Sequence, residues 1–113
     1  MTARITREEL AEEIEAGSVT VVETLGPSYY EDGHLPSAIN VPHTRVAELA
    51  PTLLPDKDAA IVTYCSNTAC ANSEIAANEL ASLGYTNVRK YAEGKQDWRE
   101  AGLPVESDVP SSA

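Results

Sequence analysis

Apolar and polar positions along the chain follow two alternating patterns, which predict strands separated by helices. Segments rich in β-branched and other apolar residues predict strands at 18–25, 38–42, 59–65 and 87–91. Apolar residues at helical spacing predict helices at 6–17, 44–53, 72–85 and 93–102. Connections of this length imply crossovers between parallel strands. The pattern therefore predicts an α/β fold, with an open, mostly parallel β-sheet and helices on both faces.

The ends and inward faces of several helices are also marked in the sequence. Thr6 and Glu9 have the spacing of a capping box at a helix start, and one further helical turn is expected around Ser28–Glu31. The last helix should turn Trp98 toward the core. The residues of the 72–85 helix that form one inward stripe are Ile75, Ala76, Leu80 and Leu83.

Length and charge limit the number of domains and the kinds of partner. With 113 residues, one domain is expected over residues 1–106. The periodicity ends after Gly102, which predicts a frayed segment from Leu103 and a flexible tail over 107–113.

The net charge of −10 and the eight scattered basic residues argue against binding to nucleic acid or to an anionic membrane. No apolar segment has the length of a signal peptide or a membrane span. Only two cysteines are present, so a cytoplasmic protein with free or redox-active thiols is expected.

Cys65 stands at the end of the most apolar of the predicted strands, and six residues separate it from a helix that begins at Asn72. Folds of this class bind ligands at the carboxyl ends of their parallel strands. The unpaired N–H groups of a helix start favour a thiolate over a thiol, and the amides of 66–71 can cradle one negative charge. The pattern predicts a nucleophilic cysteine that carries a charged atom, such as a persulfide. A cysteine that only packs in the core fits the same position.

Three segments in order resemble the rhodanese-like sulfurtransferase domain. The stretch YYEDGHLPSAINVP matches that family's turn nearly position by position. IVTYC with NSEIAANELASLGYTNV matches its strand, catalytic cysteine, loop and helix, and YAEGKQDWREAGLPVE matches its closing segment. The resemblance spans Ile5 to Glu106 and implies the rhodanese-like version of the predicted fold. It places His34 and Pro36 in a structural turn, where the histidine is expected to be hydrogen-bonded rather than to act as a base.

The resemblance also implies a site. Cys65 takes the place of the nucleophile that holds a sulfane sulfur as a persulfide. The implied activity is a ping-pong transfer from a small donor, a persulfide or thiosulfate, to a thiol acceptor that can itself be a protein, with no metal and no organic cofactor. Asn72 and His43 are candidate accessory residues, and His43 either approaches Cys65 or is solvated. The residues that take the place of the amide cradle are Ser66, Asn67, Thr68, Ala69, Cys70 and Ala71.

The sequence departs from the family pattern at several positions. The loop after Cys65 is longer than usual and has no arginine, and Asn72 stands where many members carry one. The usual Asp-x-Arg at the end of the early strand is replaced by a segment with Glu23 and Leu25, and Lys95 replaces a second glycine. Without bidentate anion binding by arginine, a neutral or protein-bound persulfide is favoured over thiosulfate as the donor. The same absence argues against phosphoryl transfer, which needs a guanidinium or a metal.

Two other functions remain open at this point. The altered loop fits a non-catalytic module of the same fold that binds a partner or a metabolite. Cys70 is either a bystander or a second redox thiol that attacks a persulfide or a sulfenic acid on Cys65. The second case makes the protein a redox-linked sulfur carrier or a thiol-dependent reductase, and it requires α-carbons closer than about 7 Å. The two cysteines with His34 and His43 form no recognisable zinc signature.

Overall fold

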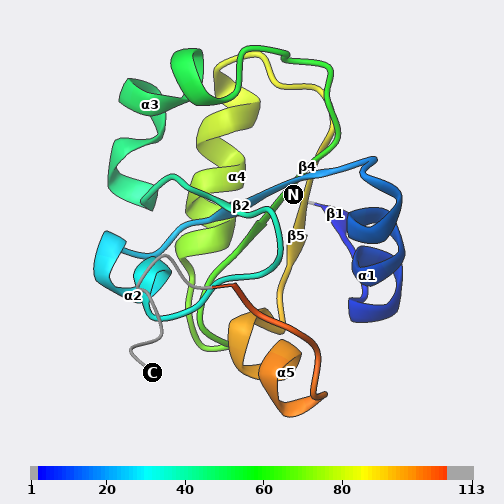
Figure 1. Cartoon of the computed structure of the whole chain (residues 1–113). Helices are drawn as coiled ribbons and strands as arrows, with labels where there is room; N and C mark the ends of the chain where they lie inside the picture. Colours follow the sequence, from blue (N-terminus) through cyan, green and yellow to red (C-terminus); the bar gives the residue numbers. More distant parts are fainter. Residues whose placement is uncertain (1–2, 107–113) are drawn as a thin grey trace.

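A computed structural model describes residues 3–106 of the chain. These residues form a five-stranded, all-parallel sheet with the strand order β1-β5-β4-β2-β3. Figure 1 labels β1, β5, β4 and β2 of this sheet. The most apolar of the predicted strands, β4, is therefore the central one, and the prediction of a parallel sheet is confirmed. The strands are β1 (Ala3–Arg4), β2 (Thr20–Glu23), β3 (Ile39–Asn40), β4 (Ile61–Tyr64) and β5 (Val88–Tyr91).

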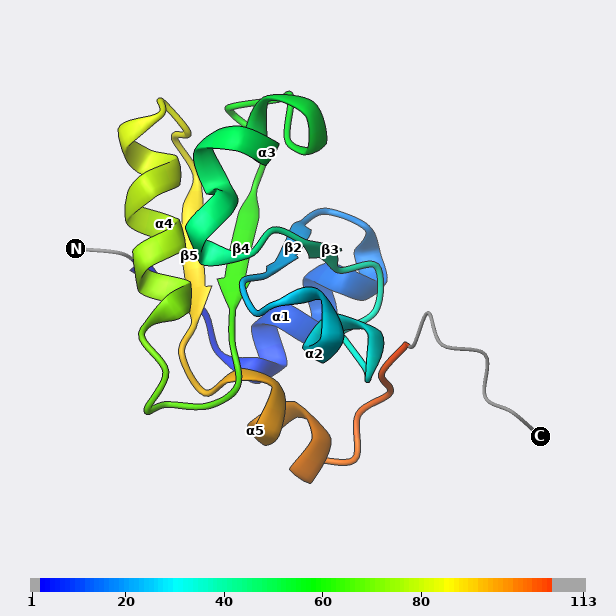
Figure 2. The same ribbon diagram turned by 90° about the vertical axis from the view of Figure 1, so that its left-hand side faces the viewer.

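Helices cover both faces of the sheet, as predicted from the crossover connections between its parallel strands (Figures 1 and 2). Val21 and Val62 of the sheet pack in one core with residues of α1 and α5, including Trp98. Val22 and Ile61 pack in the other core with residues of α3 and α4. None of the helices within 3–106 is long and apolar enough to cross a membrane. The helices are α1 (Arg7–Ala16), α2 (Pro27–Glu31), α3 (Val46–Leu53), α4 (Asn72–Ser82) and α5 (Gly94–Glu100), with a short 3-10 turn η1 (His43–Arg45) before α3.

The register of the three middle strands brings their carboxyl ends to one level. Tyr64 at the end of β4 lies opposite Glu23 of β2 and Tyr91 of β5. The residues that follow these strands therefore share one edge of the sheet. The loop after β4 turns beside α5 at this edge (Figure 2), which is where ligands bind in folds of this class.

Sequence and structure differ at the inward face of α4. Ile75 was expected to face the core but is 48% exposed, so this part of the prediction is wrong. The buried positions are Ser73, Ala76, Ala77 and Leu80. Thr63 of β4 donates a hydrogen bond to the carbonyl of Ser73, which turns this flank of the helix toward the sheet and leaves Ile75 outside.

The segment from Leu103 to Glu106 is not frayed, in contrast to the prediction. The Trp98 indole donates a hydrogen bond to the carbonyl of Pro104 at 2.8 Å. The backbones of His34 and Glu106 exchange two hydrogen bonds of 2.8 Å. These contacts fix the end of the described chain to the turn before β3, and the predicted tail at 107–113 lies outside the described residues.

Candidate functional site

The loop between β4 and α4 begins at Cys65, which is 1% exposed, and is shaped by Asn67. The Asn67 side-chain oxygen accepts a hydrogen bond from the amide of Ala69 at 3.0 Å, and its carbonyl accepts one from the amide of Cys70 at 3.1 Å. These two bonds close a tight turn. The turn reverses the chain, so Cys70 comes back toward the end of β4.

The consequence of this reversal is that the two cysteines meet. The structure joins Cys65 and Cys70 by a disulfide with an α-carbon separation of 6.4 Å, which lies within the range that disulfides occupy. Cys65 Sγ also lies 3.4 Å from the carbonyl oxygen of Cys70. The spacing required for a two-cysteine redox site is therefore met, although a spacing of four intervening residues gives no sequence signal for it.

The family resemblance implies that the backbone amides of 66–71 bind an anion, but some of these amides already donate hydrogen bonds within the loop. The amides of Ala69 and Cys70 donate to Asn67. The amides of Ser66, Thr68 and Ala71 donate to no acceptor within the described residues. Together with the first N–H groups of α4, these amides are available donors for an anion near the Cys65 sulfur.

The start of α5 holds the first two residues of the loop. The amide of Lys95 donates to the carbonyl of Cys65, and the amide of Gln96 donates to that of Ser66, each at 2.8 Å. Gly94 precedes them with φ +76°, and a Cβ at this position would lie 2.7 Å from the Cys65 carbonyl oxygen. The close approach of two backbones therefore requires a glycine here.

A buried ion pair lies beside the loop. Lys95 Nζ is 2.9 Å from Oε1 of the fully buried Glu23, and the Tyr64 hydroxyl donates to the same oxygen at 2.6 Å. Burial, and then the Glu23 charge, raise the pKa of the Tyr64 hydroxyl far above its ordinary value. The second carboxylate oxygen of Glu23 has no hydrogen-bond partner within residues 3–106.

This ion pair was not anticipated from the sequence. Glu23 and Lys95 were noted only as separate departures from the family pattern, one at the end of the early strand and one in a glycine position. The fold brings the two departures into contact, because the carboxyl end of β2 lies against the start of α5. The opposite charges of Glu23 and Lys95 were the one feature of the sequence that could have suggested an ion pair between them.

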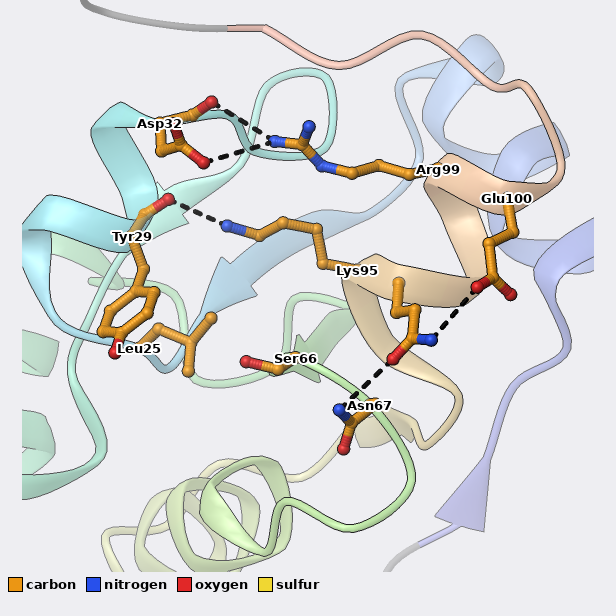
Figure 3. A pocket seen from close by; sticks show the side chains of 9 residues that line it. Leu25, Tyr29, Asp32, Ser66, Asn67, Lys95, Arg99 and Glu100 are labelled. Carbon is orange, nitrogen blue, oxygen red and sulfur yellow. Dashed lines mark hydrogen bonds and ion pairs between the residues drawn. The ribbon is translucent and has the colours of Figure 1, made fainter.

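Within residues 3–106, three cavities border the loop, and one of them lies beside Ser66 and another beside Cys70. The Ser66 cavity has a volume of about 300 Å³ and is drawn in Figure 3. In it Lys95 points to the carbonyl of Tyr29, and a chain of hydrogen bonds runs from Asn67 through Gln96 to Glu100. The Cys70 cavity has a volume of about 260 Å³. Cys65 is in the lining of neither of these two cavities.

The remaining candidate residues lie outside these contacts. His43 opens η1 and is half-buried, and its ring makes no hydrogen bond or ion pair with the part of the chain that the structure describes. Asn72 is the first residue of α4 and lines neither cavity. His34 is buried, stacks on Tyr30 and has Nδ1 2.9 Å from the Tyr30 carbonyl oxygen, as expected for a structural turn residue. Over residues 3–106, no three His, Cys, Asp or Glu side chains gather in a group that could hold a metal.

Comparison with known proteins agrees with this architecture. The family model described as the Rhodanese-like domain matches residues 6–101. The chain is 38% identical over 106 residues to the HTH-type transcriptional regulator Rv0324 of Mycobacterium tuberculosis, covering 94% of this chain and 46% of that protein. It is 37% identical over 62 residues to the thiosulfate sulfurtransferase PspE of Escherichia coli K12, covering 55% of this chain and 58% of that protein. The chain thus spans about half the length of these curated relatives.

A solved structure extends the likeness to the whole fold. The crystal structure of the BH2092 protein from Bacillus halodurans has a TM-score of 0.86 at 29% identity. The match covers 94% of this chain and 77% of that one. The architecture built up from β1 to α5 is therefore shared with a solved structure.

Proposed function

The chain belongs to the rhodanese-like domain family, and from this premise we propose that it is a sulfurtransferase acting through a persulfide on Cys65. The observation that carries the proposal is the position of Cys65, directly after the central strand and before the start of α4. A helix start stabilises negative charge on sulfur. The sulfurtransferase name of the Escherichia coli relative supports the same reaction class.

The reaction is a double displacement. With the disulfide reduced, the Cys65 thiolate attacks the outer sulfur of the donor, and the bond between that sulfur and the donor breaks. The donor leaves with the electron pair, and Cys65 carries the sulfur as a persulfide. An acceptor thiolate then attacks the outer sulfur, and Cys65 leaves as a thiolate again. The open amides of Ser66, Thr68 and Ala71 suit the terminal sulfur anion of this intermediate.

The charges near the loop favour a persulfide donor over thiosulfate. The cations closest to the Ser66 cavity are Lys95 and Arg99. Lys95 is paired with the buried Glu23 at 2.9 Å, and Arg99 approaches Asp32 at 4.0 Å. Each cation is therefore shared with a carboxylate, and the loop has no arginine of its own to bind the dianion bidentately.

A second candidate function is a binding module without sulfur transfer. The burial of Cys65, which is 1% exposed and lines neither cavity, favours it. The regulator name of the Mycobacterium tuberculosis relative is compatible with it as well. The two functions differ in one measurable property, the reactivity of the reduced Cys65 thiol toward a sulfur donor.

Intact-mass spectrometry of the reduced protein tests the proposal. The protein is exposed to thiosulfate and, separately, to glutathione persulfide. A gain of one sulfur atom that cyanide removes, absent in Cys65→Ala, is expected with glutathione persulfide and to a smaller extent with thiosulfate. Full transfer activity in Cys65→Ala would overturn the proposal. No gain with either donor, while the protein remains folded and Cys65 remains a thiol, would point to the binding module.

A further inference from the structure

We propose that Cys70 is a resolving thiol that converts the Cys65 persulfide into the Cys65–Cys70 disulfide and releases hydrosulfide. This inference rests on the proposed function, because it acts on the persulfide that the transfer reaction forms. It adds a second activity, the reduction of sulfane sulfur to sulfide at the expense of an external thiol.

The geometry that carries the inference is the return of Cys70 to Cys65. The two sulfur atoms are bonded, and the α-carbons are 6.4 Å apart. The turn at Asn67, closed by hydrogen bonds to the amides of Ala69 and Cys70, positions the second thiol. A bystander cysteine in a long loop would not need this turn, whereas a resolving thiol must reach the inner sulfur of the persulfide.

The step balances without any group beyond the two cysteines. The Cys70 thiolate attacks Sγ of the Cys65 persulfide, and a bond between the two cysteine sulfurs forms. The bond between Sγ and the outer sulfur breaks, and the outer sulfur leaves as hydrosulfide with the electron pair. The sulfane sulfur is reduced to sulfide, and the two thiols are oxidised to the disulfide.

A low-molecular-weight thiol then regenerates the dithiol, and the structure indicates where it attacks. Cys65 is buried, but Cys70 is half-exposed and lines the Cys70 cavity. An external thiolate that attacks Cys70 displaces Cys65 as the leaving thiolate at the start of α4, where negative charge is favoured. A second thiol attacks the external sulfur of the mixed disulfide on Cys70, which frees Cys70 and yields the oxidised form of the reductant.

The side chains around Cys70 indicate the class of this reductant. The cavity of about 260 Å³ has room for a small molecule but not for a protein loop. Its lining carries both signs of charge, with the ion pair of Lys90 and Glu74 at 2.7 Å and with Arg4 and Glu93. A thiol that bears both an ammonium and a carboxylate group, of amino-acid or short-peptide size, matches these charges.

The test follows the fate of one loaded sulfur atom. Reduced wild type, Cys70→Ser and Cys70→Ala are each loaded with glutathione persulfide, freed of small molecules and kept without external thiol. Wild type is expected to release one equivalent of sulfide and to end two hydrogens lighter than the dithiol. Both Cys70 variants are expected to keep the extra sulfur. When glutathione persulfide and reduced glutathione are supplied together in excess, wild type should release sulfide at least about tenfold faster than either variant, because an intramolecular thiol has a high effective concentration.

The outcomes separate this inference from the proposed function. If wild type holds the extra sulfur as long as the Cys70 variants do, the resolving role is overturned while the Cys65 persulfide stands. If none of the three proteins gains sulfur, the proposed function fails and the resolving role fails with it. Loading of both Cys70 variants, but not of Cys65→Ala, shows that the variants are folded and competent.

Discussion

Gly94, the first residue of α5, lies where the loop after β4 is very close to the helix. Its φ of +76° disfavours any side chain, and a Cβ would lie within 3 Å of three backbone atoms of the loop. Gly102 has a similar φ of +78° but open space around it. A substitution at Gly102 therefore measures the cost of the backbone conformation alone, without a steric clash. We expect Gly102→Ala to cost about 1–2 kcal/mol of unfolding free energy and Gly94→Ala about 1–3 kcal/mol more, from overpacking. Urea unfolding of the two variants measures the difference. Equal costs would mean that the loop can move away from α5.

The ion pair of Glu23 and Lys95 supports a prediction about buried charge. Removing one partner leaves an uncompensated charge in the core, so we expect Lys95→Met to lower the free energy of unfolding by about 3–5 kcal/mol. The matched control is Glu23→Gln combined with Lys95→Met, because glutamine removes the charge but keeps an acceptor for the Tyr64 hydroxyl. The double variant should be more stable than Lys95→Met alone. A double variant that is less stable would show that the Glu23 carboxylate is held by other groups.

The residues of the site differ in how far the sequence could predict them. The place of Cys65 follows from an apolar strand that ends at a thiol, since strand order and polarity bring that end to the ligand edge. The partnership of Glu23 and Lys95 depends on how α5 packs against the end of β2, and no local pattern encodes that packing. The return of Cys70 depends on a turn closed by two local hydrogen bonds, from the amides of Ala69 and Cys70 to the side chain and the carbonyl of Asn67.

Among the elements, the long and strongly apolar ones were predicted well, and the short elements α2 and β3 are also present where the sequence predicts them. The capping box at Thr6 and Glu9 is present at the start of α1, because it is a local device that needs no tertiary contact. The two-residue strand β1 was missed, since it exists only through pairing with β5. The inward position predicted for Ile75 is wrong because α4 buries a flank of mostly small residues. A prediction from hydrophobic spacing favours large apolar side chains such as Ile75 over small ones.

The contact between α1 and α5 gives a prediction about pH. Arg7 of α1 lies 3.0 Å from Asp97 of α5, and the Tyr91 hydroxyl donates to the same carboxylate at 2.5 Å. The Tyr91 hydrogen bond, and then Arg7, hold the pKa of Asp97 below its usual value of 3.8. A lowered pKa in the folded state stabilises the protein above the unfolded pKa, and this contribution is lost as the pH falls through the folded pKa.

The Asp97→Asn variant isolates this contribution. We expect it to lower the free energy of unfolding by about 1–2 kcal/mol at neutral pH, because a hydrogen-bonded charge is replaced by a neutral amide. The difference between wild type and variant should be constant above pH about 4 and should shrink below it. Denaturant unfolding of both proteins across this range measures the difference. A gap that persists at the lowest pH would mean that the carboxylate charge is not the source of the stabilisation.

At the scale of the whole molecule, the charge balance bears on the choice of donor. The net charge is −10, and six of the eight lysines and arginines, all within 3–106, are in ion pairs with carboxylates: Arg7, Arg45, Arg89, Lys90, Lys95 and Arg99. A dianion such as thiosulfate therefore approaches a negative surface with little local compensation.

Ionic strength should consequently change the rate with thiosulfate in a defined direction. Raising the salt concentration from 0.01 to 0.15 M shortens the screening length from about 30 to about 8 Å, which weakens the repulsion between the protein and the dianion. We expect kcat/KM for thiosulfate to rise a few-fold over this range, whereas a donor without net charge should show a flat profile. Steady-state kinetics with both donors at matched pH makes the comparison. A fall in kcat/KM with salt would show that a local group of cations attracts the donor strongly enough to outweigh the charge of the whole molecule.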